Sequence, residues 1–155
     1  MTSHYFRVVP LRSEAADAAR RALAAGAPDH SLVTADAPKS YPCRHCLKCA
    51  NPGERVILFP FAAIEPGGPW TDIGPIFVHA EACERYAETE TFPPQFRDGR
   101  AMRAYDSEQN MIDALVVQGD EAEACIAGLL ENSAADFINV HSVTRGCYTF
   151  GIKRA

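Results

Sequence analysis

The sequence lacks long hydrophobic runs, and it lacks an excess of positive charge. Its longest apolar stretch, Val56–Ile64, has nine residues and contains Pro60, whereas a membrane-spanning helix needs about 18 or more. Lysine and arginine number 15 against 20 aspartates and glutamates, which gives a formal net charge of -5. Such a chain has no basic stripe with which to neutralise phosphates. We therefore expect neither a membrane-spanning segment nor a nucleic-acid partner.

The N-terminal residues also lack a targeting pattern. Residues 1–7 contain no basic region followed by an apolar run, so we expect neither a signal peptide nor a transit peptide. A soluble, cytoplasmic protein is the resulting expectation. In that compartment the six cysteines are more often reduced thiols, metal ligands or redox groups than disulfide partners.

The length and composition favour one globular domain over residues 1–155. With 155 residues, 47% of them hydrophobic, the chain can bury about 70% of its unfolded surface, so disulfide staples are unnecessary. Most of the predicted strands are joined by turns compatible with hairpins, which indicates an α+β fold with a largely antiparallel sheet. The strands are expected over Tyr5–Val9, Arg55–Phe61, Gly74–His79, Arg100–Tyr105, Met111–Gln118, Phe137–His141 and Cys147–Ile152.

Two to three helices and long irregular loops complete the expected fold. Ser13 is the expected N-cap of the first helix, which Gly26 closes, and Asp120 is the expected N-cap of the last helix. A short helix is expected over Ala80–Glu88. Residues 26–54 contain four prolines and show no sustained periodicity, so they predict a long loop whose order needs an explanation.

Cysteine and histidine occur at metal-ligand spacing in two places. Cys43 and Cys46 lie three residues apart in the long loop, a spacing at which a tight turn presents both sulfurs to one tetrahedral ion. His79 ends a predicted strand and Cys83 follows four residues later, so both side chains can point to one side of the helix start. Together they form a set of three thiolates and one imidazole that suits zinc. A bound ion would also explain how the loop stays ordered.

Other roles remain open for these cysteines. They can be reduced thiols that pack in the loop and the helix. The Cys-x-x-Cys pair can also cycle between dithiol and disulfide, with Arg44, His45 and Lys48 lowering a thiol pKa. The pair lacks the glycine that often follows the second cysteine of a zinc knuckle. Cys49 extends it to a run that suggests an iron–sulfur site, but Gly53 stands where the fourth cysteine would be, so we set that cluster aside.

A thiol-dependent enzyme is the second function that the sequence allows. If residues 142–146 form the loop of a terminal hairpin, His141 and Cys147 oppose each other across the strands, with Cβ atoms about 4.5–5.5 Å apart. An imidazole beside a thiol can activate it as a nucleophile, and Arg145 can hold an anionic substrate. Because no third group that orients the histidine is identifiable, a packed cross-strand pair is the commoner outcome.

A corner that binds a small anion is a further possibility. Arg103 and Tyr105 alternate onto the same face of their predicted strand, where a guanidinium and a phenol can receive an anionic ligand. A stacked pair on an exposed sheet face is the commoner arrangement. Trp70, in a turn rich in glycine and proline, is expected to cover an edge of the core rather than to bind a ligand.

Several short motifs together resemble the bacterial family catalogued as domain of unknown function 1203. The resemblance extends from about Tyr5 to Arg154, and it implies small, single-domain, soluble proteins with no assigned activity. The family pattern includes the Cys43/Cys46 pair, His79, Cys83 and the Gly-Cys of the last hairpin, but not Cys49. The motifs are Tyr41-Pro42-Cys43-Arg44-His45-Cys46-Leu47, Pro52-Gly53-Glu54, Gly74-Pro75-Ile76-Phe77-Val78-His79 with Cys83, Arg103-Ala104-Tyr105-Asp106 and Gly146-Cys147-Tyr148.

These observations lead to one expected function and two alternatives. We expect a metal-binding domain in which Cys43, Cys46, His79 and Cys83 hold a structural zinc ion. A site closed by four protein ligands has no open position for a substrate or water, so it favours stability or binding over metal catalysis. The alternatives are the thiol-dependent enzyme and an interaction module whose cysteines only pack.

Overall fold

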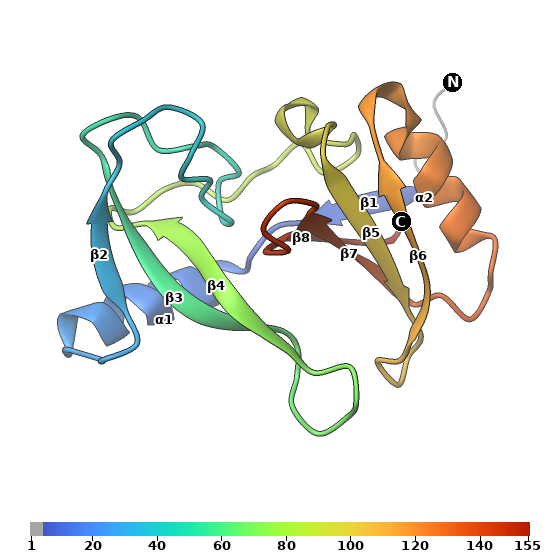
Figure 1. Cartoon of the computed structure of the whole chain (residues 1–155), viewed down its shortest axis with the longest axis horizontal. Helices are drawn as coiled ribbons and strands as arrows, with labels where there is room; N and C mark the ends of the chain where they lie inside the picture. Colours follow the sequence, from blue (N-terminus) through green and yellow to red (C-terminus); the bar gives the residue numbers. More distant parts are fainter. Residues whose placement is uncertain (1–4) are drawn as a thin grey trace. The chain divides into compact units, whose positions relative to one another are not determined.

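The protein has an α+β fold with two antiparallel sheets. The computed structural model describes residues 5–155, and in this range the chain forms eight strands, two α-helices and two short 3-10 helices (Figure 1). The predicted fold class is confirmed. Residues 1–4 lie outside the described range. They belong to the segment 1–7, for which we expect no targeting sequence. Within residues 5–155, no helix is both long and apolar enough to cross a membrane.

The larger sheet has five strands in the order β1-β8-β7-β5-β6, and each neighbouring pair is antiparallel. One face buries Met102, Ile138 and Phe150 completely, because these alternating apolar residues all point to the same side. Helix α2 contacts β6 in this part of the chain. The elements are β1 (Phe6–Val9), β5 (Arg100–Tyr105), β6 (Met111–Val117), α2 (Ala122–Leu130), β7 (Phe137–Ser142) and β8 (Tyr148–Arg154).

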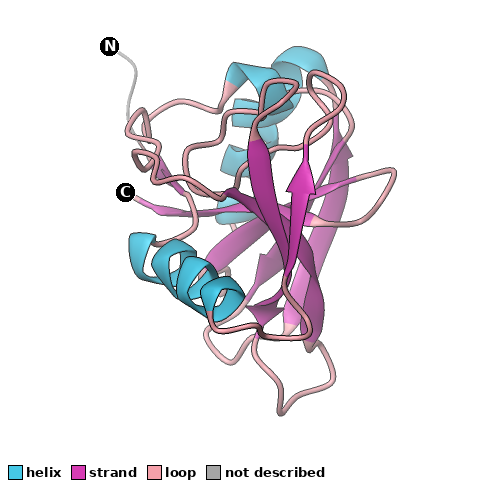
Figure 2. Cartoon of the chain, turned by 90° about the vertical axis from the view of Figure 1, so that its left-hand side faces the viewer, coloured by secondary structure: helices cyan, strands magenta, loops and turns pink. Residues whose placement is uncertain are grey.

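The smaller sheet has three strands in the order β2-β3-β4. They are β2 (Ser31–Thr34), β3 (Arg55–Ile64) and β4 (Asp72–His79), and helix α1 (Ser13–Ala24) precedes them. A small core of Ala35, Ala50 and Val56 is covered by Val33, Tyr41 and Phe77. Figure 2 shows how much of the chain lies in loops between the strands and helices.

The described chain divides into two compact units. Residues 5–9, 63–72 and 88–155 form the first, here called the five-stranded unit, and residues 10–62 and 73–87 form the second, here called the cysteine unit. Strands β3 and β4 run through both, and the turn between them belongs to the five-stranded unit. The expectation of a single domain over 1–155 is not tested by this division and stays a prediction.

Two predicted elements differ from the structure in the cysteine unit. The segment 26–54 is not entirely loop, because Ser31–Thr34 pairs with β3 as the antiparallel strand β2. The predicted helix over Ala80–Glu88 is wrong, since this segment is irregular. Its polar groups bond to distant partners instead: the Tyr86 amide donates to the His45 carbonyl at 3.0 Å, and the Arg85 guanidinium donates to the Pro10 carbonyl at 2.6 Å.

The expected N-caps of both helices are also wrong, whereas Gly26, with a φ of 80°, follows the end of the first helix as predicted. Helix α1 begins at Ser13, with Arg12 at the N-cap position and no side-chain cap. Helix α2 is preceded by a 3-10 turn over Gly119–Glu121, and Glu121 rather than Asp120 stands at its N-cap. Ser13 makes a different contact, with the ring of His45, so its hydroxyl is used by the site described below.

Candidate metal centre

The first half of the site is a tight turn that begins at Cys43. The Leu47 amide donates to the Cys43 carbonyl at 2.9 Å, and the Cys43 amide donates to the Lys48 carbonyl at 3.1 Å. Leu47 has a φ of 60°, a left-handed conformation that glycine adopts more readily. Its side chain is 0% exposed, so burial offsets a backbone strain of about 1–3 kcal/mol. Leucine therefore occupies the position at which the sequence lacks the usual glycine.

The second half of the site comes from the end of β4 and the segment after it. The turn docks against β4 through a parallel bridge between Cys43 and Phe77 and through the Arg44 amide, which donates to the Phe77 carbonyl at 2.9 Å. His79, the last residue of β4, donates its amide to the Cys43 sulfur at 3.3 Å. The irregular chain beyond it then brings Cys83 to the same place.

The structure brings together the four side chains that the sequence singled out. The ligand atoms of Cys43, Cys46, His79 and Cys83, here called the Cys/His cluster, all lie within 4.8 Å of one another. The sulfurs of Cys43 and Cys83 are 3.9 Å apart, and the Cys46 sulfur is 3.4 Å from Nδ1 of His79. All of these cysteines are free thiols. Cys49 is not part of the cluster.

Hydrogen bonds among the four side chains of the cluster shift the pKa values of all four groups. Hydrogen bonds from Cys46 and Cys83 lower the pKa of the Cys43 thiol strongly. The pKa values of Cys46 and Cys83 are raised, because each thiol is hydrogen-bonded to the Cys43 sulfur. Hydrogen bonds to Cys43 and then Cys46 raise the pKa of His79 to about 10. Near neutral pH the raised pKa of His79 favours a positively charged ring beside the sulfurs. A metal ion can supply positive charge in place of that proton and the protons of the thiols.

Polar groups around the cluster contact its ligands from outside. The Glu54 carboxylate lies 3.9 Å from Nε2 of His79, the ring nitrogen that faces away from the cluster sulfurs. His45 places Nδ1 3.1 Å from the Cys83 sulfur, and Arg20 places Nη2 3.7 Å from it. Burial lowers the pKa of His45, which favours the neutral ring. Glu54 and Arg20 could not be predicted as site residues, because single charged residues carry no spacing signal.

The terminal hairpin does not form the predicted pair of histidine and cysteine. His141 lies opposite Tyr148 rather than Cys147, because the strands pair Val140 with Phe150 and the bulge after Val140 shifts the register by only one residue. The ring of His141 contacts the carbonyl of Gly146 at 2.9 Å through Nδ1. The Cys147 sulfur contacts the carbonyl of Arg145 at 3.9 Å, and the Arg145 side chain is exposed. The predicted cross-strand pairing is therefore wrong, while a catalytic role for His141, Cys147 and Arg145 is not tested and stays a prediction.

A carboxylate lies near this histidine, although the sequence did not point to it. Nε2 of His141 lies 3.5 Å from the Asp72 carboxylate, which also lies 3.4 Å from the Arg103 guanidinium. Tyr105 is 1% exposed and stacks on Phe137 with ring centroids 5.1 Å apart. A small anion near Arg103 and Tyr105 would therefore compete with Asp72, and this ligand stays a prediction.

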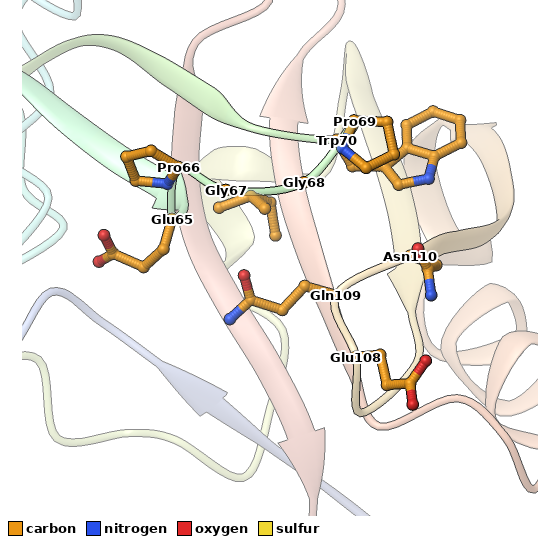
Figure 3. Close-up of a pocket in the computed structure, with 10 residues that line it drawn as sticks. Glu65, Pro66, Gly67, Gly68, Pro69, Trp70, Glu108, Gln109 and Asn110 are labelled. Carbon is orange, nitrogen blue, oxygen red and sulfur yellow. The ribbon is translucent and has the colours of Figure 1, made fainter.

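A hollow of about 220 Å³ lies between two hairpin turns of the five-stranded unit. The segments 64–70 and 108–110 line it (Figure 3). Trp70 is 41% exposed, so it lines this hollow instead of covering a core edge. The charged side chains here are the carboxylates of Glu65 and Glu108, and neither cysteine nor histidine is among the lining residues.

Comparison with known proteins gives a family and no activity. The model of a family described as "Protein of unknown function (DUF1203)" matches residues 40–154. This range contains the whole Cys/His cluster and both hairpins discussed above, although it begins later than the resemblance expected from Tyr5 onward. No curated protein and no solved structure matches the chain.

Proposed function

The chain belongs to the DUF1203 family, and we propose that its Cys/His cluster binds one structural zinc ion. The distances within the cluster carry this proposal. In a tetrahedral site with Zn–S bonds of about 2.3 Å and Zn–N bonds of about 2.05 Å, two sulfurs are about 3.8 Å apart and a sulfur and a nitrogen about 3.6 Å apart. The corresponding distances are 3.9 Å between Cys43 and Cys83 and 3.4 Å between Cys46 and His79.

The donor atoms favour zinc over other ions. Three sulfurs and one imidazole nitrogen are ligands of borderline-soft, tetrahedral ions, whereas calcium and magnesium require oxygen ligands and higher coordination numbers. The Glu54 carboxylate near the outer nitrogen of His79 adds the carboxylate–histidine arrangement that orients many zinc-binding imidazoles. Four protein ligands complete the tetrahedron, so the ion has no open position for a substrate and serves stability.

The benefit to the fold follows from where the ligands lie. Two come from the turn at Cys43–Leu47 and two from the end of β4 and the irregular segment behind it, so the ion links stretches with few strands or helices of their own. Ordering each residue of such stretches costs about 1–2 kcal/mol of backbone entropy. Structural zinc sites supply about 10–16 kcal/mol of binding free energy in small domains at neutral pH. This is enough to offset the entropy cost of ordering several residues.

Elemental analysis combined with a thiol count tests this proposal. Purified protein should contain one zinc per chain, and the three cluster cysteines should be protected from thiol reagents until a chelator is added. Cys49, Cys125 and Cys147, which lie outside the cluster, should react without a chelator. Six freely titratable thiols and no bound metal would contradict the proposal and would leave the packed-thiol and redox interpretations.

A further inference from the structure

We infer that helix α1 belongs to the metal centre. His45 and Arg20 each place a nitrogen near the Cys83 sulfur, and Ser13 contacts the ring of His45. These three residues, here called the Cys83 shell, couple metal binding to the docking of α1. The inference rests on the proposed function, because it needs an ion at the Cys/His cluster. It assigns to three residues outside the ligand set a role in positioning Cys83.

His45 connects the Cys83 sulfur to the start of α1. Its Nδ1 lies 3.1 Å from that sulfur, and its Nε2 lies 2.9 Å from the hydroxyl oxygen of Ser13. A neutral imidazole has one donor and one acceptor, and a metal-bound thiolate only accepts. The consistent arrangement is therefore Nδ1–H donating to sulfur and the Ser13 hydroxyl donating to Nε2. The His45 side chain, 3% exposed, holds this alignment away from water.

Arg20 reaches the same sulfur from two helical turns further along α1. Its Nη2 lies 3.7 Å from the Cys83 sulfur and donates to the Glu81 carbonyl at 3.2 Å, and its Nε donates to the His79 carbonyl at 3.1 Å. Ser13 and Arg20 are seven residues apart, so they share one face of the helix. One guanidinium thus fixes the backbone between two ligands and contacts one of them.

Charge and exposure explain why Cys83 is the ligand that needs such a shell. A zinc ion with three thiolates and a neutral imidazole carries one net negative charge. The Arg20 guanidinium, which also pairs with Asp17 at 3.0 Å, places positive charge 3.7 Å from one of the three sulfurs. The side chains of Cys43 and Cys46 are buried, whereas Cys83 is only partly buried. Cys83 is therefore more accessible to water than the other two cysteines. The N–H groups of His45 and Arg20 lie near its sulfur in positions that water molecules would otherwise take.

The coupling has to be reciprocal. If docking of α1 raises metal affinity, then metal binding must stabilise the docked helix by the same free energy. Outer-shell partners of metal ligands are worth about 10- to 100-fold in affinity. We therefore expect His45→Ala and Arg20→Ala each to weaken zinc binding by a factor in that range.

Competition with a chromophoric chelator, together with cobalt substitution, tests the shell directly. His45→Ala should weaken zinc binding about 10- to 100-fold and should shift the sulfur-to-cobalt charge-transfer band. His45→Asn, whose amide can donate to the sulfur from a similar position, should recover part of both effects. Arg21→Ala is the matched control for Arg20→Ala, because Arg21 is the exposed neighbour on the same helix, and it should bind zinc as the wild type does.

Hydrogen exchange of the wild-type chain tests the coupling without any substitution. Chelation should reduce the protection of the α1 amides, residues 13–24, while the amides of α2 in the five-stranded unit keep theirs. The inference is overturned if the wild type and the His45 and Arg20 variants bind zinc equally well, and if chelation leaves hydrogen exchange of the α1 amides unchanged. The proposed function would then stand. If the wild type binds no zinc, both fail together.

Discussion

Replacing Cys43 by serine should remove most of the stability that zinc gives to the cysteine unit. The Cys43 side chain is 0% exposed and its sulfur receives the His79 amide at 3.3 Å, so no other side chain or water can replace this ligand. A ligand specific for the folded state stabilises it by about 4 kcal/mol when its free concentration is about 1,000 times Kd. Each kcal/mol is worth about 2–4 °C in a chain of this size. Zinc should therefore raise the Tm of the wild type by about 8–16 °C, and that of Cys43→Ser by far less.

The four ligands should act as one unit, so their effects should not add. Once Cys43→Ser has removed the ion, Cys83→Ser has little left to lose, and the double variant should melt close to either single variant. Cys125→Ser is the control. Cys125 lies on α2 in the five-stranded unit, so its effect should add to that of Cys43→Ser.

Thermal unfolding of the single and double variants, with added zinc and with chelator, is the assay. The reasoning would be refuted if the decreases in Tm caused by Cys43→Ser and Cys83→Ser were additive in the double variant and if neither zinc nor chelator changed the Tm. These residues would then be independent thiols that pack in the core.

Three further predictions concern other parts of the chain. Glu54→Gln should weaken zinc binding about 10-fold or more in chelator competition, because we expect its carboxylate, 3.9 Å from Nε2 of His79, to orient the metal-bound imidazole; unchanged affinity would remove it from the site. Alkylation at pH 6.5 should not single out Cys147, and His141→Ala should leave its rate unchanged, since the register separates the two residues; fast labelling of Cys147 that depends on His141 would restore the enzyme hypothesis. The Arg97 guanidinium lowers the pKa of Glu123, so their ion pair contributes stability above the ordinary glutamate pKa and loses it as pH falls through the lowered value. The stability difference between wild type and Arg97→Gln should accordingly shrink between pH 6 and pH 3, and a difference that stays constant with pH would argue against the ion pair.

The cluster could be predicted from the sequence because its signal lies in residue type and spacing. Cys43 and Cys46 sit three apart in a segment without periodicity, and His79 and Cys83 sit four apart at the end of an apolar run. Thiol and imidazole groups are rare enough for such spacing to be informative. The predicted helix at residues 80–88 was wrong, yet the pairing of His79 with Cys83 did not depend on it, since an irregular segment of the same length also reaches the site.

The surroundings of the cluster could not be predicted, because they depend on contacts between residues far apart in the chain. Arg20 and Ser13 meet Cys83 and His45 only after α1 has docked, and arginines and serines are too common to suggest such a contact. The pairing of His141 with Cys147 failed for a related reason. The strands pair Val140 with Phe150, and a bulge then places His141 opposite Tyr148. Such a register depends on the geometry of the turn and the bulge, which the alternation of residues does not reveal.

X-ray absorption at the zinc edge of the purified protein tests the central claim most directly. We expect a first shell of three sulfurs at about 2.3 Å and one nitrogen at about 2.05 Å, and this shell should be absent from Cys83→Ser. A first shell of oxygen and nitrogen atoms without sulfur would contradict it, because zinc would then be bound elsewhere than at Cys43, Cys46, His79 and Cys83.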